Sequence, residues 1–417
     1  MSPASDPLLQ DHQVLQRDGD DKARVRLDGG EIVELPVGGP YEVGGARDVL
    51  VGDLWVLAGQ SNMEGVGDLV DVEPPSPYVH SYQSREQWAV AGEPLHWLGE
   101  SPRVVHHRLW GRDRVPDEPD RRDPQRAKGA GLGLTFARLR HDRTGVPVGL
   151  IPSAHGGTSM TQWDPALRDG GGASLYGATI ERVRAVGGRV AGVLWYQGES
   201  DANPDDLPLY KERLTRLFAA LRADLARPDL PIYYVQIGRF VDASASVADW
   251  NGLREAQRTW AGTVAGTAMV SAIDLELDDL IHIGTQGLKR LGARLAAVAD
   301  GHRSPEIADV RVEGDRERIR IVFDHARGGL RAAGRPAGFS LRDAAGHEIP
   351  AIYKVTLAGD AAVLHLVSDA LPPEARLWYG WGLDPYCNVT DAADMAIPAF
   401  GPLLLPPDRI PSPKESA

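Results

Sequence analysis

Four short groups of polar or reactive side chains stand out in the sequence, and each follows an apolar run. Ser61 lies in AGQSNMEG, while Asp279 and His282 lie three residues apart in DDLIHIGTQG. A serine hydroxyl becomes a nucleophile when a base takes its proton, and an imidazole oriented by a carboxylate is the usual base. These residue types therefore indicate acyl-transfer chemistry if the fold brings them together.

The other two groups contain donors suited to a developing negative charge. Gly156 and Gly157, in SAHGGTSMTQWD, offer backbone N–H groups, and Gln197, in LWYQGESDAN, offers a side-chain amide. Preorganised donors of this kind stabilise an oxyanion. Each group alone has an ordinary alternative: a Ser/Asn turn at Ser61, a surface or capping histidine at His282, and a helix cap after Gln197.

The elements between these groups predict a parallel sheet that gathers them at one edge. Apolar runs that predict strands alternate with amphipathic stretches that predict helices. This alternation is typical of a parallel sheet covered on both faces, whose ligands bind beyond the carboxyl ends of the strands. The expected strands cover 49–59, 145–154, 190–198, 230–238 and 266–274, and the expected helices cover 207–226 and 285–301.

Other segments are expected to flank this core. Residues 1–48 and 303–405 alternate polar and apolar pieces around turns, which predicts β structure at both ends of the chain. A long insert, roughly 66–128, is rich in Pro, Arg, Asp and Trp and predicts irregular structure. We therefore expect an N-terminal β segment, a catalytic domain over 49–302, a sandwich-like C-terminal β domain and a tail over 406–417.

The composition disfavours several classes of protein. The chain of 417 residues has a net charge of −13, which argues against nucleic-acid and anionic-membrane partners. Its single cysteine, Cys387, excludes an intrachain disulfide and a zinc–thiolate site. The N-terminus shows no signal-peptide pattern, and no stretch approaches roughly 18 apolar residues, so we expect a cytoplasmic protein without a transmembrane helix.

The four groups resemble the blocks of the SGNH hydrolase superfamily, above all its sialate O-acetylesterase and carbohydrate acetylesterase branch. The similar segments are GQSNM, HGGTS, WYQGESD and DLIH, and the similarity continues in LLQDHQVLQRD and YGWGLDPYCNV. The resemblance implies a three-layer α/β/α, flavodoxin-like core. It also implies a serine esterase that removes O-acetyl groups from a carbohydrate through an acyl-enzyme, with no cofactor or metal.

Carried over to this sequence, the resemblance implies that Ser61 is the nucleophile, His282 the general base and Asp279 the residue that orients it. The backbone N–H groups of Ser61 and Gly157 and the side chain of Gln197 would line the oxyanion hole. The third block departs from the superfamily, which presents Asn in G-x-N-D where this chain has GESD. The candidates for substrate contact are Gln60, Asn62, His155 and Glu199, and an ion pair beneath the site is the alternative role for Glu199.

Three alternatives stay open on the sequence alone. A divalent-metal site is the first, because four acidic residues crowd near His282, namely Asp274, Glu276, Asp278 and Asp279. A non-catalytic carbohydrate-binding protein is the second, with the aromatic residues of the terminal β units as platforms. The third is a lipase-like esterase, but the polar insert suits a sugar better, including an acidic one such as sialate. Its arginines are Arg103, Arg108, Arg112, Arg114, Arg121 and Arg122.

Overall fold

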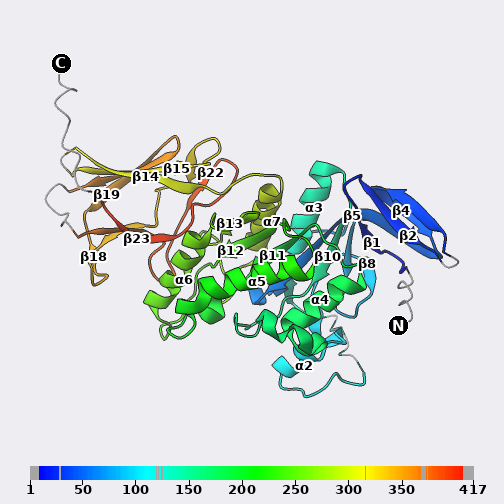
Figure 1. Ribbon diagram of the computed structural model, residues 1–417. Coiled ribbons are helices and arrows are strands. Elements are labelled where there is room, and N and C mark those ends of the chain that lie inside the picture. The colour runs from blue at the N-terminus through cyan, green and yellow to red at the C-terminus, as the bar shows by residue number, and fades with distance from the viewer. Residues whose placement is uncertain are drawn as a thin grey trace.

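The computed structural model describes residues 9–406, apart from 28–29, 119, 121, 124, 315, 368–371 and 373. A central sheet is covered by helices on both faces, and β units extend beyond its two ends (Figure 1). The expected α/β core with flanking β segments is confirmed. The expected tail lies, beyond its first residue, outside the described residues.

The central sheet follows the order expected of a doubly wound fold. Its main strands are β5 (Ala46–Gly59), β7 (Val79–Tyr82), β8 (Trp88–Val90), β10 (Val148–Pro152), β11 (Gly192–Tyr196), β12 (Ile232–Gln236) and β13 (Thr267–Ser271). They are arranged β13-β12-β11-β5-β10-β7-β8, and every pair is parallel except β7–β8. Because β10 and β11 lie on opposite sides of β5, the strand order reverses at β5, where ligands bind in such sheets.

Five helices of the described chain cover the two faces of this sheet. The helices α3 (Gly133–Thr144) and α7 (Thr285–Ala299) lie on one face (Figure 1). The other face carries α4 (Leu175–Ala185), α5 (Tyr210–Asp224) and α6 (Val247–Trp260). All five residues of β10 and of β11 are buried, as the continuous apolar runs of a two-sided parallel sheet require.

The insert is more regular than its composition predicts, and the expectation of an irregular segment is wrong for part of it. Its β7 pairs with β10, and β8 pairs with β7, so the insert extends the central sheet. Backbone hydrogen bonds to a preformed strand supply order that such short runs lack on their own. Its remaining elements are β6 (Gly67–Asp68), the short helix at Leu98–Glu100 and α2 (Val104–Leu109), and β9 (Lys128–Ala130) follows it.

The N-terminal β unit is joined to the core through a shared strand. Its strands are β1 (Val14–Gln16), β2 (Lys22–Arg26), β3 (Ile32–Pro36) and β4 (Gly38–Val43). Both β1 and β4 pair with the first half of β5. β5 therefore runs across residue 48, where the domain boundary was expected.

The C-terminal unit contains two four-stranded sheets, β14-β15-β20-β19 and β18-β17-β21-β23, and the pair β16-β22. Its strands are β14 (Glu306–Glu313), β15 (Arg318–Asp324), β16 (Leu330–Ala332), β17 (Phe339–Arg342), β18 (Glu348–Ile349), β19 (Ile352–Ala358), β20 (Ala361–Leu366), β21 (Arg376–Tyr379), β22 (Val389–Asp391) and β23 (Phe400–Leu404). It contacts the core through the buried Arg254 of α6, which donates to the carbonyls of Gly382 and Leu383.

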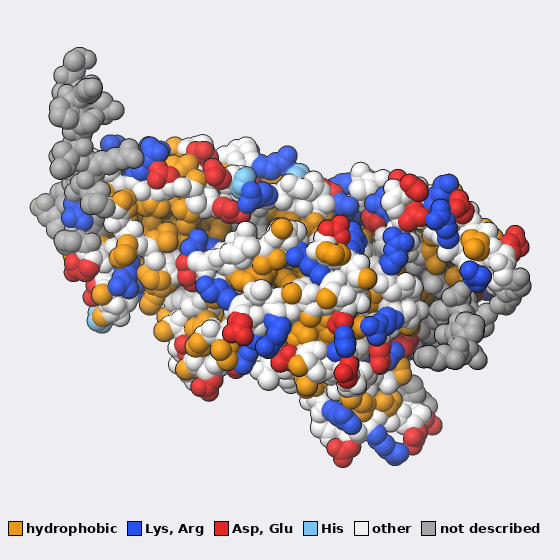
Figure 2. Space-filling view, in the orientation of Figure 1, with side chains coloured by type: hydrophobic (Ala, Val, Ile, Leu, Met, Phe, Trp, Pro, Cys, Tyr) orange, Lys and Arg blue, Asp and Glu red, His pale blue; other side chains and the backbone are white. Residues whose placement is uncertain are grey.

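Acidic and basic side chains are interspersed over the face of the molecule seen in Figure 2. Among the described helices, none is both long and apolar enough to cross a membrane.

Candidate active site

The segment that carries Ser61 turns sharply at the end of β5. A Cβ at Gly59 would lie 2.1 Å from the carbonyl oxygen of Tyr196 in β11, and Gly59 has a φ of 133°, so the turn requires glycine. The chain then forms the short helix α1 (Ser61–Glu64). Ser61 thus stands at the carboxyl end of the central strand, and its Oγ has no hydrogen-bond partner among the described residues.

His282 and Asp279 form a hydrogen-bonded pair in the loop before α7. Nδ1 of His282 lies 2.7 Å from Oδ2 of Asp279, whose Oδ1 accepts the backbone N–H groups of Ile281 and His282. Burial acts to raise the pKa of Asp279, but these bonds outweigh it and lower that pKa to about 2. Asp279 is therefore charged at neutral pH, and Nε2 is the ring nitrogen left to accept a proton.

Ser61, Gly157 and His282 line one pocket of about 500 Å³, which we call the active pocket. No hydrogen bond joins Ser61 to His282 within the described structure; such contacts often tighten only when substrate binds. The active pocket is also lined by Gln60, Glu64, Val66, Trp110, His155, Gly156, Glu199, Ser200, Phe240, Trp250 and Ile281. The sheet thus brings the predicted nucleophile and the predicted base into a single cavity.

The loop after β10 contributes Gly156 and Gly157 to the lining of the active pocket. Gly157 has a φ of 68°, the left-handed conformation that favours glycine. Among the described residues, neither its N–H nor that of Ser61 has a hydrogen-bond acceptor. The preceding N–H, of Gly156, donates to Oε2 of Glu64 at 2.7 Å. Two backbone donors are therefore available beside Ser61.

Gln197 lies outside the active pocket, unlike the arrangement expected from the sequence. It is fully buried, and its Nε2 donates to the carbonyl of Thr158 (3.1 Å) and to Oδ2 of Asp201. A primary amide has two N–H donors, and both are used here. Burial raises the pKa of Asp201 to about 6. Gln197 in this arrangement has no donor left for an oxyanion.

Asn62 and Gln60 hold the loops that surround Ser61. The Nδ2 of Asn62 donates to Glu199 (2.9 Å), and its Oδ1 accepts the N–H of Ile283 (3.0 Å), next to His282. Oε1 of Gln60 accepts the N–H of Ser200 at 3.3 Å. Burial raises the pKa of Glu199, and the bond from Asn62 opposes that shift. Of these expected substrate-contact residues, Gln60 and Glu199 line the active pocket, whereas Asn62 is buried beneath it.

His155, also expected to contact substrate, lines the active pocket and binds a histidine of the insert. Its Nδ1 lies 2.9 Å from Nδ1 of His106, and the two rings stack with centroids 5.2 Å apart. Burial lowers the pKa of His155 to about 4, and burial also lowers the pKa of His106 well below its ordinary value. Both rings are therefore neutral near pH 7, which allows one to donate to the other.

Several lining residues were not predicted from the sequence, among them Glu64, Trp110 and Phe240. Glu64 stands three residues after Ser61, so its nearness to the nucleophile was a usable signal. Trp110 reaches the active pocket only because α2 packs beside the loop after β10, a contact that no local pattern reveals. Phe240 follows β12, the one predicted strand of the core after which the sequence predicted no candidate site residue.

The acidic residues considered for a metal site have separate partners. Asp274 is bound by Arg290 and Arg294, and Glu276 is bound by Arg239. Within the described residues, no group of three or more His, Cys, Asp or Glu side chains has the arrangement of a metal site.

The arginines of the insert are also largely paired. Arg103 binds Glu86 and Glu181, Arg112 binds Asp120, Arg114 binds Asp117, and Arg122 binds Glu100. Arg121 lies outside the described residues.

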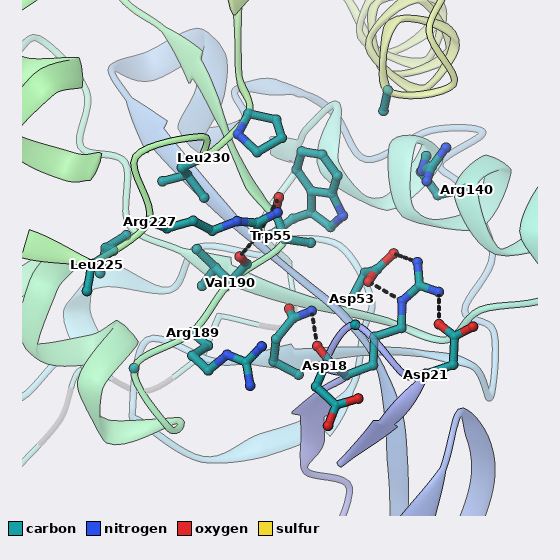
Figure 3. Close-up of a pocket in the computed structure, with 18 of the residues that line it drawn as sticks. Asp18, Asp21, Asp53, Trp55, Arg140, Arg189, Val190, Leu225, Arg227 and Leu230 are labelled. Carbon is teal, nitrogen blue, oxygen red and sulfur yellow. Dashed lines mark hydrogen bonds and ion pairs between the residues drawn. The ribbon is translucent and has the colours of Figure 1, made fainter. Parts of the chain in front are cut away.

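A larger pocket, of about 810 Å³, lies toward the amino ends of the central strands, away from the active pocket. Asp53, Trp55 and Arg140 are among its lining residues (Figure 3). Asp53 is held there by two hydrogen bonds from Arg17, at 2.7 and 2.9 Å. Among the described residues, no serine, histidine or cysteine lines this pocket. It therefore lacks the nucleophile and base that the active pocket contains.

Comparison with known proteins places the chain in a family. Residues 51–300 match the family described as "Carbohydrate esterase, sialic acid-specific acetylesterase". A protein of Arabidopsis thaliana, named as a probable carbohydrate esterase, is 30% identical over 269 residues, which are 58% of this chain and 88% of that protein. The crystal structure of a carbohydrate acetylesterase from Xanthomonas citri has the same fold, with a TM-score of 0.68 and 23% identity over 94% of this chain and 98% of that one. The chain belongs to the carbohydrate esterase family of the sialic acid-specific acetylesterase type, as the resemblance of its four sequence blocks predicted.

Proposed function

We propose that the protein hydrolyses O-acetyl esters of a carbohydrate through an acetyl-enzyme formed on Ser61. The observation that carries this proposal is the active pocket, where Ser61, His282 and the free N–H of Gly157 meet. His282 Nε2 takes the hydroxyl proton while Ser61 Oγ attacks the acetyl carbonyl, and Asp279 holds the ring in the required tautomer.

The negative charge of the tetrahedral intermediate falls on the former carbonyl oxygen. The backbone N–H groups of Ser61 and Gly157 receive it, and each such donor is worth about 10²–10³ in kcat. His282 then gives its proton to the departing sugar hydroxyl. A water molecule, deprotonated by His282, releases acetate and restores Ser61.

Acetate release from a panel of esters tests the proposal. The panel contains p-nitrophenyl acetate, acetylated xylo-oligosaccharides and O-acetylated sialic acid, the last because of the family's description. We expect acetate release from at least one sugar ester and its loss in Ser61→Ala with the fold retained. Retention of most of the wild-type rate by Ser61→Ala would overturn the mechanism.

A further inference from the structure

The insert places an exposed tryptophan at the edge of the active pocket. Trp110 directly follows α2, and 46% of its surface is exposed, more than that of any other tryptophan in the described chain. Its ring lies tilted against His155, with centroids 5.6 Å apart, and edge-on to His107 at 6.2 Å. The guanidinium of Arg112 also lies over the ring, 5.8 Å from its centroid. An indole held by these three neighbours and still open to solvent is a surface on which the C–H face of a sugar ring can pack.

Trp110 also lines a second cavity, which we call the insert hollow. This cavity of about 250 Å³ shares Trp110 and Glu64 with the active pocket, so the two are adjacent across these side chains. The insert hollow is otherwise lined by Trp97, Leu98, Gly99, Glu100, Asp120, Asp123 and Arg126. The active pocket, of about 500 Å³, lies within the size range of ligand sites, roughly 300–1,000 Å³, and the insert hollow extends it.

The linings of both cavities are rich in carboxyl groups. Glu64 and Glu199 line the active pocket, and no lysine or arginine of the described chain does so. Three further acids line the insert hollow, but Glu100 is paired with Arg122 and Asp120 with Arg112. Arg126 lines it as well, and its guanidinium lies 4.9 Å from the centroid of the Trp97 ring. Carboxyl groups can exchange hydrogen bonds with sugar hydroxyls, and among its described lining residues the active pocket offers no lysine or arginine to pair with the carboxylate of an acidic sugar.

From these contacts we propose that Trp110 and the insert hollow form a binding subsite for a neutral O-acetylated oligosaccharide. The sugar that bears the ester packs on Trp110 in the active pocket, and the neighbouring sugar occupies the insert hollow beside Glu100. This proposal rests on the proposed function, because the chain of sugars is placed relative to Ser61. It predicts a preference for neutral oligosaccharides over both monosaccharides and O-acetylated sialic acid.

The test compares kcat/KM for an acetylated xylotriose, an acetylated xylose, O-acetylated sialic acid and p-nitrophenyl acetate. In Trp110→Ala we expect the ratio of the trisaccharide value to the p-nitrophenyl acetate value to fall about tenfold, the loss of one sugar–indole contact. Trp110→Tyr should restore most of that ratio. The control is Tyr386→Ala, which removes an aromatic side chain 62% exposed in the C-terminal unit and should leave the ratio unchanged.

The outcomes separate the two proposals. An unchanged ratio in Trp110→Ala, or wild-type preference for acetylated sialic acid or for the monosaccharide, overturns the subsite while Ser61-dependent turnover of p-nitrophenyl acetate upholds the esterase. Absence of any Ser61-dependent turnover overturns the proposed function and the subsite with it. A tenfold fall in Trp110→Ala, rescued by Trp110→Tyr, supports the subsite.

Discussion

Oε2 of Glu64 accepts a hydrogen bond from the backbone N–H of Gly156 at 2.7 Å. Glu64 ends the turn that carries Ser61, and Gly156 belongs to the loop that presents the N–H of Gly157. The bond therefore ties the nucleophile segment to the loop with the proposed oxyanion donor. Burial raises the pKa of Glu64 to about 7, although the bond from Gly156 and the charge of Arg126 oppose that shift.

Two replacements of Glu64 distinguish the effect of its hydrogen bond on kcat from the effect of its charge. Glu64→Gln keeps an oxygen acceptor for Gly156 and should retain most of kcat. Glu64→Ala frees the loop and should lower kcat for p-nitrophenyl acetate about tenfold, less than the 10²–10³ of losing a donor outright. Glu255→Ala is the matched control, because Glu255 accepts the N–H of Gly401 in another part of the protein. Equal kcat in both Glu64 variants would contradict this positioning role.

The raised pKa of Glu64 also predicts a dependence of stability on pH. Between the ordinary value of 4.5 and about 7, the folded state holds this proton more tightly than the unfolded state does. The free energy of unfolding contributed by Glu64 therefore falls as pH rises through this range, by up to about 3 kcal/mol. Glu64→Gln should gain stability relative to wild type as pH rises, measured by urea denaturation between these values. A constant difference across the range would contradict the prediction.

Asp279→Asn should lower kcat by about 10⁴ without unfolding the protein. Its Oδ1 can still accept the N–H groups of Ile281 and His282, but its NH₂ would face Nδ1 of His282 and favour the tautomer protonated on Nε2. The matched control is Asp343→Asn, because Asp343 binds His347 and two backbone N–H groups in the same way. The measurement is kcat for p-nitrophenyl acetate hydrolysis by both variants and by the wild-type protein. A small decrease in kcat would instead indicate that Asp279 only stabilises the loop and does not orient His282 for catalysis.

Asn62→Ala should lower kcat while leaving KM nearly unchanged, because Asn62 holds the His282 loop rather than the substrate. We expect a loss of about 1–3 kcal/mol in the free energy of unfolding, since buried partners lose their bonds. Asn388→Ala is the control: like Asn62, Asn388 makes three hydrogen bonds, all of them to the backbone of the C-terminal unit, and its loss should leave kcat unchanged. A rise in KM alone would instead assign Asn62 to substrate binding.

The sequence was sufficient to predict where the candidate site lies. Apolar runs alternating with amphipathic helices predict a parallel sheet, and in such a sheet the residues after β5, β10, β11 and β13 must share one edge. Asp279 and His282 are three residues apart, so their bond is also a local property that spacing can predict.

The contacts that could not be predicted join segments far apart in the chain. His106 and His155 are 49 residues apart, and nothing near either residue indicates that α2 would pack there. The orientation of Gln197 depends on its hydrogen bond to the carboxylate of the buried Asp201. That carboxylate is held in turn by the backbone N–H of Met160, which lies in a loop 41 residues earlier in the chain. Likewise, Val79–Tyr82 becomes a strand because β10 offers its edge, not because four residues have a strong intrinsic preference.

Detection of an acetyl group on Ser61 during turnover would demonstrate the proposed acetyl-enzyme. The wild-type protein is mixed with p-nitrophenyl acetate, quenched in acid within the first turnovers and digested for mass spectrometry of the peptide that contains Ser61. An activated ester makes acylation fast, so the acetyl-enzyme should accumulate. We predict one acetyl group on that peptide, at Ser61, and none in Ser61→Ala. Turnover without acetylation of Ser61 at any sampled time, or acetate release by Ser61→Ala at the wild-type rate, would contradict a mechanism that proceeds through Ser61.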